Sequence, residues 1–185
     1  DYGSQYSQLI ARRVRELGVY SELHAFNLSV ERIRELHPTG IILSGSPYSA
    51  YEQGAPISSP EIFELGIPVL GICFGLQLIG YQLGGEVDRA ARREYGQATL
   101  SIDDRTDLFA DIPDSDEGLR VWMSHGDHLT KMPPGFEAIG HTANAPICAI
   151  RNPAKRIYAV QFHPEVVHTR SEEHTSELQS PMYLV

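Results

Sequence analysis

A cysteine lies between two glycines in the segment Gly71-Ile72-Cys73-Phe74-Gly75. The apolar residues 69–72 predict a buried strand before it, and residues 74–83 predict a helix after it. This is the nucleophile-elbow pattern G-x-S-x-G with cysteine in place of serine, in which the tight turn requires small flanking residues. The free N–H groups and dipole at a helix N-terminus favour a thiolate there. We therefore predict that Cys73 is a nucleophile; the alternative is a small buried hydrophobe.

A thiolate nucleophile needs a base, and the base needs an acid that orients it. The segment His163-Pro164-Glu165 supplies both, at the end of a strand predicted over residues 157–162. Residues two apart in an extended chain project to the same side, and Pro164 keeps the residue before it extended. We predict that His163 and Glu165 act with Cys73. The alternatives are an ordinary histidine beside a solvated carboxylate, or a zinc deaminase site, for which P-C-x-x-C is absent.

Two further polar segments follow predicted strands. Ser44-Gly45-Ser46-Pro47 comes after the apolar residues 41–43 and offers backbone N–H groups for a second oxyanion contact, or simply forms a turn. Residues 122–128 (WMSHGDH) follow a strand predicted over 119–123, and we expect a ligand-contact loop or a solvated turn there. Metal binding by His125, Asp127 and His128 matches no zinc signature, so we expect no metal site.

The elements that must position these residues alternate between strand and helix in the first half of the chain. We predict a helix capped by Ser4 and ended by Gly18, three more helices near 29–36, 59–65 and 74–83, and strands over 19–25, 41–43 and 69–72. The second half adds strands over 95–102, 119–123, 147–150 and 157–162. We therefore predict a three-layer α/β domain, with a mainly parallel central sheet flanked by helices and an antiparallel, strand-rich part.

The composition of the 185 residues fits one globular domain. Fifteen Lys and Arg against 24 Asp and Glu give a net charge of −9, which argues against nucleic acid and anionic membranes as partners. The most apolar stretch, residues 69–79, is far shorter than the ~20 residues of a membrane span. The two cysteines are far apart in sequence, so we predict neither a disulfide nor a cysteine zinc site, and a reducing cytoplasm is the favoured location. We expect Cys148 to lie in the core. We expect the run Arg92-Arg93-Glu94 to lie in solvent.

The two ends of the sequence do not continue this pattern. Asp1-Tyr2-Gly3-Ser4 is typical of a strand end followed by a helix cap, so we expect that the first strand is missing. Residues 171–185 (SEEHTSELQSPMYLV) carry three Glu and no Lys or Arg, and residues 170–180 resemble translated adapter sequence; the alternative is a natural polar tail. We predict a domain over 1–170, truncated at its end, and a non-native, disordered tail over 171–185.

Together these segments resemble the class I, triad-type glutamine amidotransferases. The resemblance covers residues 1–170 and rests on four segments: residues 1–6 together with 10–16, then 71–75, 122–127 and 160–169. The second and fourth of these segments are shared across the family. The first and third resemble the branch in which the released ammonia converts XMP to GMP.

The resemblance implies that Cys73 attacks the side-chain amide of glutamine and forms a γ-glutamyl thioester, with glutamate and ammonia as products. His163 would then be base and acid, and Glu165 would orient it. The N–H groups of Ser46 and Phe74 would bind the oxyanion, although Ser46 stands where the family usually has glycine. The residues that would bind the substrate are Gly45, Gln77, Ser124, Gly126 and Asp127.

The resemblance also implies a partner, a synthetase (ATP-pyrophosphatase) domain that uses ATP and Mg²⁺. The chain carries no phosphate-binding glycine loop, so we expect no cofactor in this domain. Two alternatives stay open. One is another cysteine hydrolase on a similar elbow, such as a γ-glutamyl hydrolase or a peptidase. The other is an inactive docking fragment with unpaired strand edges.

Overall fold

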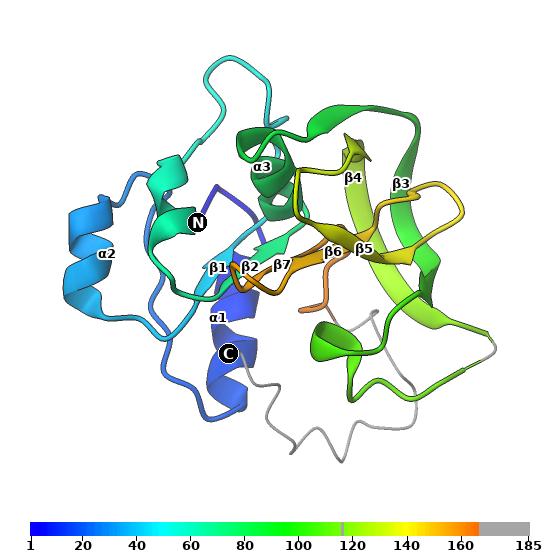
Figure 1. The fold of residues 1–185 in the computed structure, drawn as a ribbon, viewed down its shortest axis with the longest axis horizontal. Helices are drawn as coiled ribbons and strands as arrows, with labels where there is room; N and C mark the ends of the chain where they lie inside the picture. The colour runs from blue at the N-terminus through cyan, green and yellow to red at the C-terminus, as the bar shows by residue number, and fades with distance from the viewer. Residues whose placement is uncertain (116, 167–185) are drawn as a thin grey trace.

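The computed structural model describes residues 1–115 and 117–166, without the side chains of residues 91–93 (Figure 1). Within this part, seven strands form one sheet in the order β1-β2-β7-β6-β5-β3-β4. The strands are β1 (Ile41–Leu43), β2 (Val69–Ile72), β3 (Glu86–Ile102), β4 (Leu119–Lys131), β5 (Glu137–His141), β6 (Ala149–Asn152) and β7 (Ile157–Val160). The helices are α1 (Ser7–Glu16), α2 (Val30–Leu36) and α3 (Phe74–Gln82), with short 3₁₀ helices at Pro60–Glu64 and Asp107–Phe109.

The sheet has a parallel part and an antiparallel part. β2 lies between β1 and β7 and is parallel to both, so that Val69 is in register with Ile41 and Ile157. The other four pairings in the described residues are antiparallel. β3 and β4 extend beyond the sheet as a long ribbon, with a register shift between Arg89 and Glu94. The prediction of an α/β domain with parallel and antiparallel parts is confirmed.

Helices cover the sheet on both faces, with α3 above it and α1 below it in the view of Figure 1. The apolar cluster on the α3 side includes Phe74, Leu78 and Leu129. The cluster on the α1 side includes Ile10 and Phe162. Burial of these side chains stabilises the three-layer arrangement by roughly 1.5–3 kcal/mol for each fully buried large residue.

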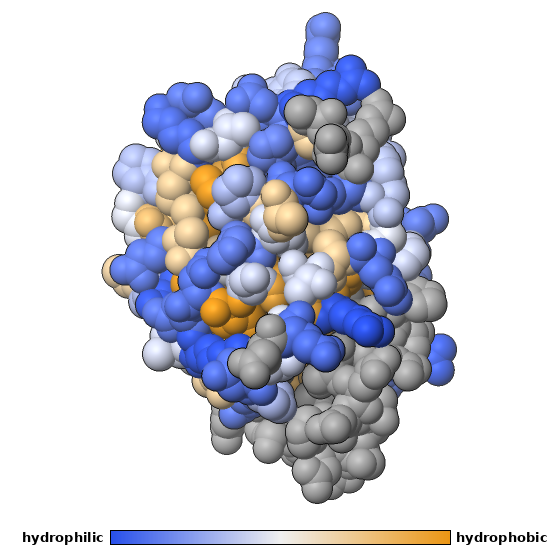
Figure 2. All heavy atoms as spheres, turned by 90° about the vertical axis from the view of Figure 1, so that its right-hand side faces the viewer, coloured by the Kyte–Doolittle hydropathy of each residue, from blue (hydrophilic) through white to orange (hydrophobic). Residues whose placement is uncertain are grey.

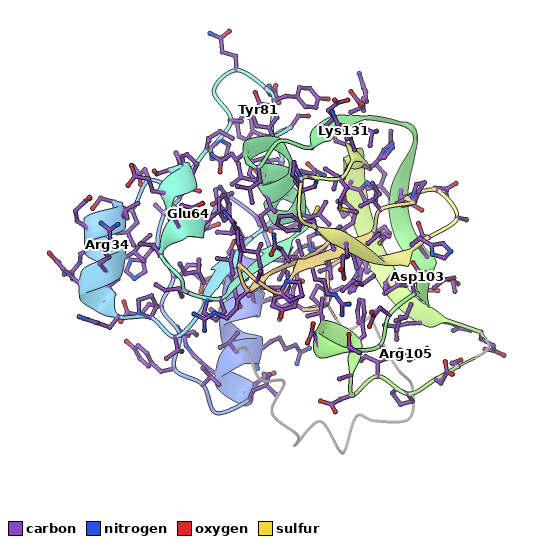
Figure 3. All side chains as sticks on the ribbon, viewed as in Figure 1. Arg34, Glu64, Tyr81, Asp103, Arg105 and Lys131 are labelled. Carbon is purple, nitrogen blue, oxygen red and sulfur yellow. The ribbon has the colours of Figure 1, made fainter. Side chains whose placement is uncertain are left out.

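The surface contributes much less to stability. Hydrophilic residues cover most of the side formed by β3 and β4, with apolar patches between them (Figure 2). The charged residues labelled in Figure 3 lie on the outside of the molecule. All five have an ion-pair partner: Glu31 for Arg34, Lys155 for Glu64, His141 for Asp103, Asp114 for Arg105 and Glu86 for Lys131. Exposed pairs of this kind contribute about 0–1 kcal/mol each.

Among the helices of the described residues, none has the length and apolar character that a membrane span requires.

Several local predictions are corrected by the structure. Residues 19–25 form no strand, although the end of this segment lies beside Asp1, whose N-terminal amine donates to the His24 carbonyl at 2.6 Å. The N-cap of α1 is Tyr6 rather than Ser4, which instead accepts from Tyr6 N–H in the preceding turn. β5 and the first half of β3 were not predicted, because they carry charged residues and glycine without a clean alternation. The predicted tail, residues 171–185, lies outside the described residues.

The close approach of α3 to the parallel strands depends on two glycines of the elbow. A Cβ on Gly71 would lie 2.7 Å from the backbone of Gly75. A Cβ on Gly75 would overlap the carbonyl oxygen of Leu43 and lie 3.0 Å from the Leu43 Cβ. Real Cβ atoms do not approach backbone this closely, so α3 would have to move away from β1.

We therefore expect Gly75→Ala to lower the free energy of unfolding by about 1–3 kcal/mol, the usual cost of overpacking. Chemical denaturation measures this loss. Gly40→Ala is the matched control, because its Cβ would meet only the Pro68 oxygen at 3.9 Å. Equal stability of the two variants would show that α3 does not depend on this contact.

Candidate active site

Cys73 occupies the turn between β2 and α3 in a conformation that few residues other than glycine adopt. Its φ is 55° and its ψ is −103°, and it is the N-cap of α3. The turn is held from both sides: Cys73 N–H donates to the Val160 carbonyl at 2.8 Å, and Cys73 O accepts from Leu76 and Gln77 N–H. Strained backbone of this kind persists only where the surroundings over-determine it, and it is concentrated at functional sites.

The predicted base and its orienting acid lie beside this turn. His163 and Glu165 are both almost fully buried, and His163 Nδ1 lies 2.7 Å from Glu165 Oε1. This bond leaves Nε2 as the ring nitrogen available to Cys73. The segment is fixed from two other elements, because His163 N–H donates to the Trp122 carbonyl at 2.9 Å and Arg13 Nε donates to the Glu165 carbonyl at 3.2 Å.

The charge state of His163 follows from its contacts. Burial lowers the pKa of His163, but its hydrogen bonds to the side chains of Cys73 and Glu165, with the charges of these groups, outweigh burial and raise the pKa to about 10. The imidazole is therefore protonated at neutral pH. A positive charge at hydrogen-bonding distance favours the thiolate form of a cysteine.

A cavity of about 880 Å³ opens in front of the sulfur. Most of the site residues expected from sequence line it: Gly45, Ser46, Cys73, Gln77, Ser124, Gly126, Asp127 and His163. Two do not. Glu165 lies behind His163, and the Phe74 ring packs against Tyr2 with 5.3 Å between ring centroids. The Phe74 N–H is the first of α3, where backbone donors have no partner within the helix.

Asp127 is one of two acidic residues that line this cavity; the other is Glu52. Its carboxylate accepts from the hydroxyl groups of Ser49 and Tyr51, at 3.1 Å for Tyr51. Its carbonyl accepts from Gln77 Nε2 at 3.0 Å and lies 2.9 Å from His125 Nδ1. Gln77 thus fixes the backbone that carries Asp127. Sequence reasoning missed Ser49 and Tyr51, because a serine and a tyrosine in a loop carry no distinctive pattern.

The segment 122–128 was predicted to be a ligand-contact loop or a solvated turn. In the structure it is part of β4. Its residues alternate between buried and partly buried, as the period of a strand requires. Glu94, expected in solvent, is buried, and its Oε2 lies 3.1 Å from His125 Nε2. His125 also contacts the Asp127 carbonyl through Nδ1, so the pair of Glu94 and His125 holds the backbone of Asp127 in place. Within the described residues, no cluster of three or more His, Cys, Asp or Glu side chains could hold a metal ion.

Comparison with known proteins places this arrangement in a family. The sequence pattern described as glutamine amidotransferase class-I matches residues 1–179. The chain belongs to this family. The matching region continues past residue 170, where the domain was predicted to end, so that boundary stays a prediction.

Relatives of this amidotransferase chain include two proteins named GMP synthase (glutamine-hydrolysing). The protein of Trichormus variabilis is 57% identical over 169 residues, and the protein of Gloeobacter violaceus is 55% identical over 170 residues. These matches cover 91% and 92% of this chain but only 31% and 30% of the relatives. The chain therefore spans about a third of the length of the curated relatives it matches.

Solved structures of amidotransferases share the fold. A protein from Thermoplasma acidophilum, described as a putative GMP synthase subunit, superposes with a TM-score of 0.83 at 29% identity, covering 92% of this chain and 84% of that one. A glutamine amidotransferase from Thermotoga maritima superposes with a TM-score of 0.68 at 22% identity, covering 89% and 74%. The second likeness shows the fold alone.

The raised pKa of His163 predicts how stability depends on pH. The folded value of about 10 exceeds the ordinary value of 6.5, so protonated His163 stabilises the fold fully below 6.5. This contribution is lost as the pH rises through about 10. We expect His163→Gln to be less stable than the unchanged protein near pH 6.5, and the difference to shrink toward pH 10. Urea unfolding at several pH values measures it; a difference that does not vary with pH would contradict a protonated His163.

Proposed function

We propose that this domain hydrolyses the side-chain amide of glutamine to glutamate and ammonia through a thioester on Cys73. The observation that carries the proposal is the pairing of a strained cysteine at a helix N-terminus with a buried histidine that is itself bonded to a buried glutamate. This is the constellation that activates a cysteine nucleophile. Family membership supports amide hydrolysis over the other reactions of such triads.

The first half of the reaction makes the thioester. The thiolate of Cys73 attacks the amide carbon, a C–S bond forms, and the electron pair of the C=O bond moves to the oxygen. The backbone N–H groups of Ser46 and Phe74 are the proposed donors to this oxyanion. His163 gives its proton to the amide nitrogen. The electron pair on the oxyanion then re-forms the C=O bond, the C–N bond breaks with its pair staying on nitrogen, and ammonia leaves.

The second half releases glutamate. Neutral His163 takes a proton from a water molecule, which attacks the thioester carbon. The C–S bond then breaks and its electron pair returns to the sulfur as thiolate. Glu165 keeps Nδ1 of His163 protonated throughout, so that Nε2 is the nitrogen that gives and takes the proton.

The acidic wall of the cavity suits the other end of the substrate. Glutamine carries a positive α-amino group. Of the two carboxylates that line the cavity, Glu52 is exposed and Asp127 is buried, with Ser49, Tyr51 and Gln77 holding it in place. We infer that Asp127 binds this ammonium, with Gly45, Ser124 and Gly126 as close backbone neighbours of the substrate.

The ammonia is proposed to serve a synthetase (ATP-pyrophosphatase) domain that converts XMP to GMP with ATP and Mg²⁺. The support is the likeness to proteins named GMP synthase, of which this chain matches about a third. A cytoplasmic location fits the two buried free cysteines, Cys73 and Cys148.

The proposed nucleophile is tested with a diazo-ketone analogue of glutamine and peptide mass. We expect labelling at Cys73 alone, blocked by excess glutamine, because burial raises the pKa of Cys148 and keeps it protonated. Cys73→Ala is expected to abolish glutamine hydrolysis, whereas Cys148→Ala stays within a few-fold. Labelling of both cysteines alike, or hydrolysis of peptides in preference to glutamine, would overturn the proposal.

The proposed role of Asp127 is tested by saturation kinetics. Asp127→Asn keeps the shape but removes the charge that meets the α-ammonium, so the KM for glutamine should rise at least about tenfold, the usual worth of a hydrogen bond to a charged group. The exposed Asp111→Asn is the matched control and should leave KM unchanged. An unaltered KM in Asp127→Asn would remove this residue from substrate binding.

A further inference from the structure

The reaction described above leaves one polar group beside the nucleophile without a role. Gln161 follows β7 directly, and its side chain is fully buried. Its Nε2 donates to Cys73 Sγ at 3.8 Å. Its backbone N–H donates to the Cys148 carbonyl at 2.7 Å, which fixes the residue beside the elbow.

Stability does not explain a glutamine at this position. Among the described residues, Gln161 Oε1 is a buried oxygen with no hydrogen-bond partner. Its chain neighbours, Val160 and Phe162, belong to the apolar cluster on the α1 side of the sheet. A methionine would fill the same space without burying an unpaired oxygen. The contact of Nε2 with the sulfur is therefore the interaction that accounts for the carboxamide.

The groups around the sulfur distinguish its two protonation states. The Ser124 carbonyl lies 3.7 Å from Sγ and can accept only from a thiol S–H. Gln161 Nε2 and His163 are donors, and they favour a sulfur that carries the negative charge. The Ser124 carbonyl thus favours the thiol form of Cys73, whereas the Gln161 carboxamide favours the thiolate form.

We propose that Gln161 is a further catalytic residue of the amide hydrolysis, whose carboxamide stabilises the thiolate of Cys73 both before attack and when the sulfur leaves the thioester. This inference rests on the proposed function. When water attacks the thioester, its proton passes to His163, the C–S bond breaks, and the electron pair returns to Sγ. The carboxamide donor is present at every stage, because it never gives up a proton.

The test is the pH dependence of the rate at which iodoacetamide alkylates Cys73 in the full chain, followed by peptide mass. Gln161→Met keeps the shape and removes the donor. We expect it to move the midpoint of alkylation upward by about one pH unit. It should also lower kcat/KM for glutamine at neutral pH with KM within a few-fold.

The other titratable groups near the sulfur are unchanged in this variant, so the shift reports the carboxamide. They are His163 and Glu165 after β7, His125, Asp127 and Glu94 on the β3–β4 ribbon, Tyr6 ahead of α1, and Cys148 before β6. The cavity in front of the sulfur is also lined by Tyr48, Tyr51, Glu52, Arg89 and Tyr95.

Gln82→Met is the matched control. Gln82 also donates through Nε2, to the Ser58 carbonyl at 2.8 Å, and also has an Oε1 without a partner in the described residues, but it lies at the far end of α3. It should leave the midpoint unchanged. If Gln161→Met fails to fold, Gln161→Asn takes its place, because the shorter carboxamide does not reach the sulfur.

An unshifted midpoint in a folded Gln161 variant would overturn the inference, as would an equal shift in Gln82→Met. The alkylation readout does not involve glutamine. A shifted midpoint in a protein that never hydrolyses glutamine would therefore sustain the role of Gln161 at the sulfur while refuting the proposed function.

Discussion

The structure depends on one close packing contact, between the first turn of α3 and the parallel strands beneath it. Gly71 and Gly75 bring helix backbone against strand backbone, where no Cβ fits. This proximity puts the Cys73 N–H within reach of the Val160 carbonyl and sets the positive φ of the cysteine. A larger residue at either glycine would move the helix, and with it the N-terminal donors that face the sulfur.

Around this contact, polar groups from distant segments converge on one atom. The segment after β7 contributes His163 and Gln161, β4 contributes the Ser124 carbonyl, and α1 holds the triad segment through Arg13. All of these groups except the Arg13 side chain are buried or partly buried, so solvent does not screen the charges they carry. Placement on or directly beside strands keeps the geometry fixed before the substrate arrives.

The parts of this site that sequence predicts are those with short-range patterns. The elbow glycines, the strand–helix switch at Cys73 and the His163–Glu165 spacing all lie within a few residues, and the structure brings them together. The residues that surround the triad were not predictable in this way. Glu94 was expected in solvent because it follows two arginines, yet it is buried beside His125, 31 residues away. Ser49 and Gln161 acquire their roles only through tertiary contacts. Residues 19–25 were predicted as a strand, but the structure assigns no strand to them.

The strand order has a consequence for synthesis of the chain. Among the strands of the described residues, β7 comes last in sequence but inserts between β2 and β6, so the sheet stays open in its middle until residue 160 has been made. Pairings of such long sequence separation form late in folding. Cys73 is therefore translated ninety residues before His163, the difference between positions 73 and 163. In a nascent chain the elbow turn thus lacks its partner in β7, and the Cys73 N–H reaches the Val160 carbonyl only once β7 is in place.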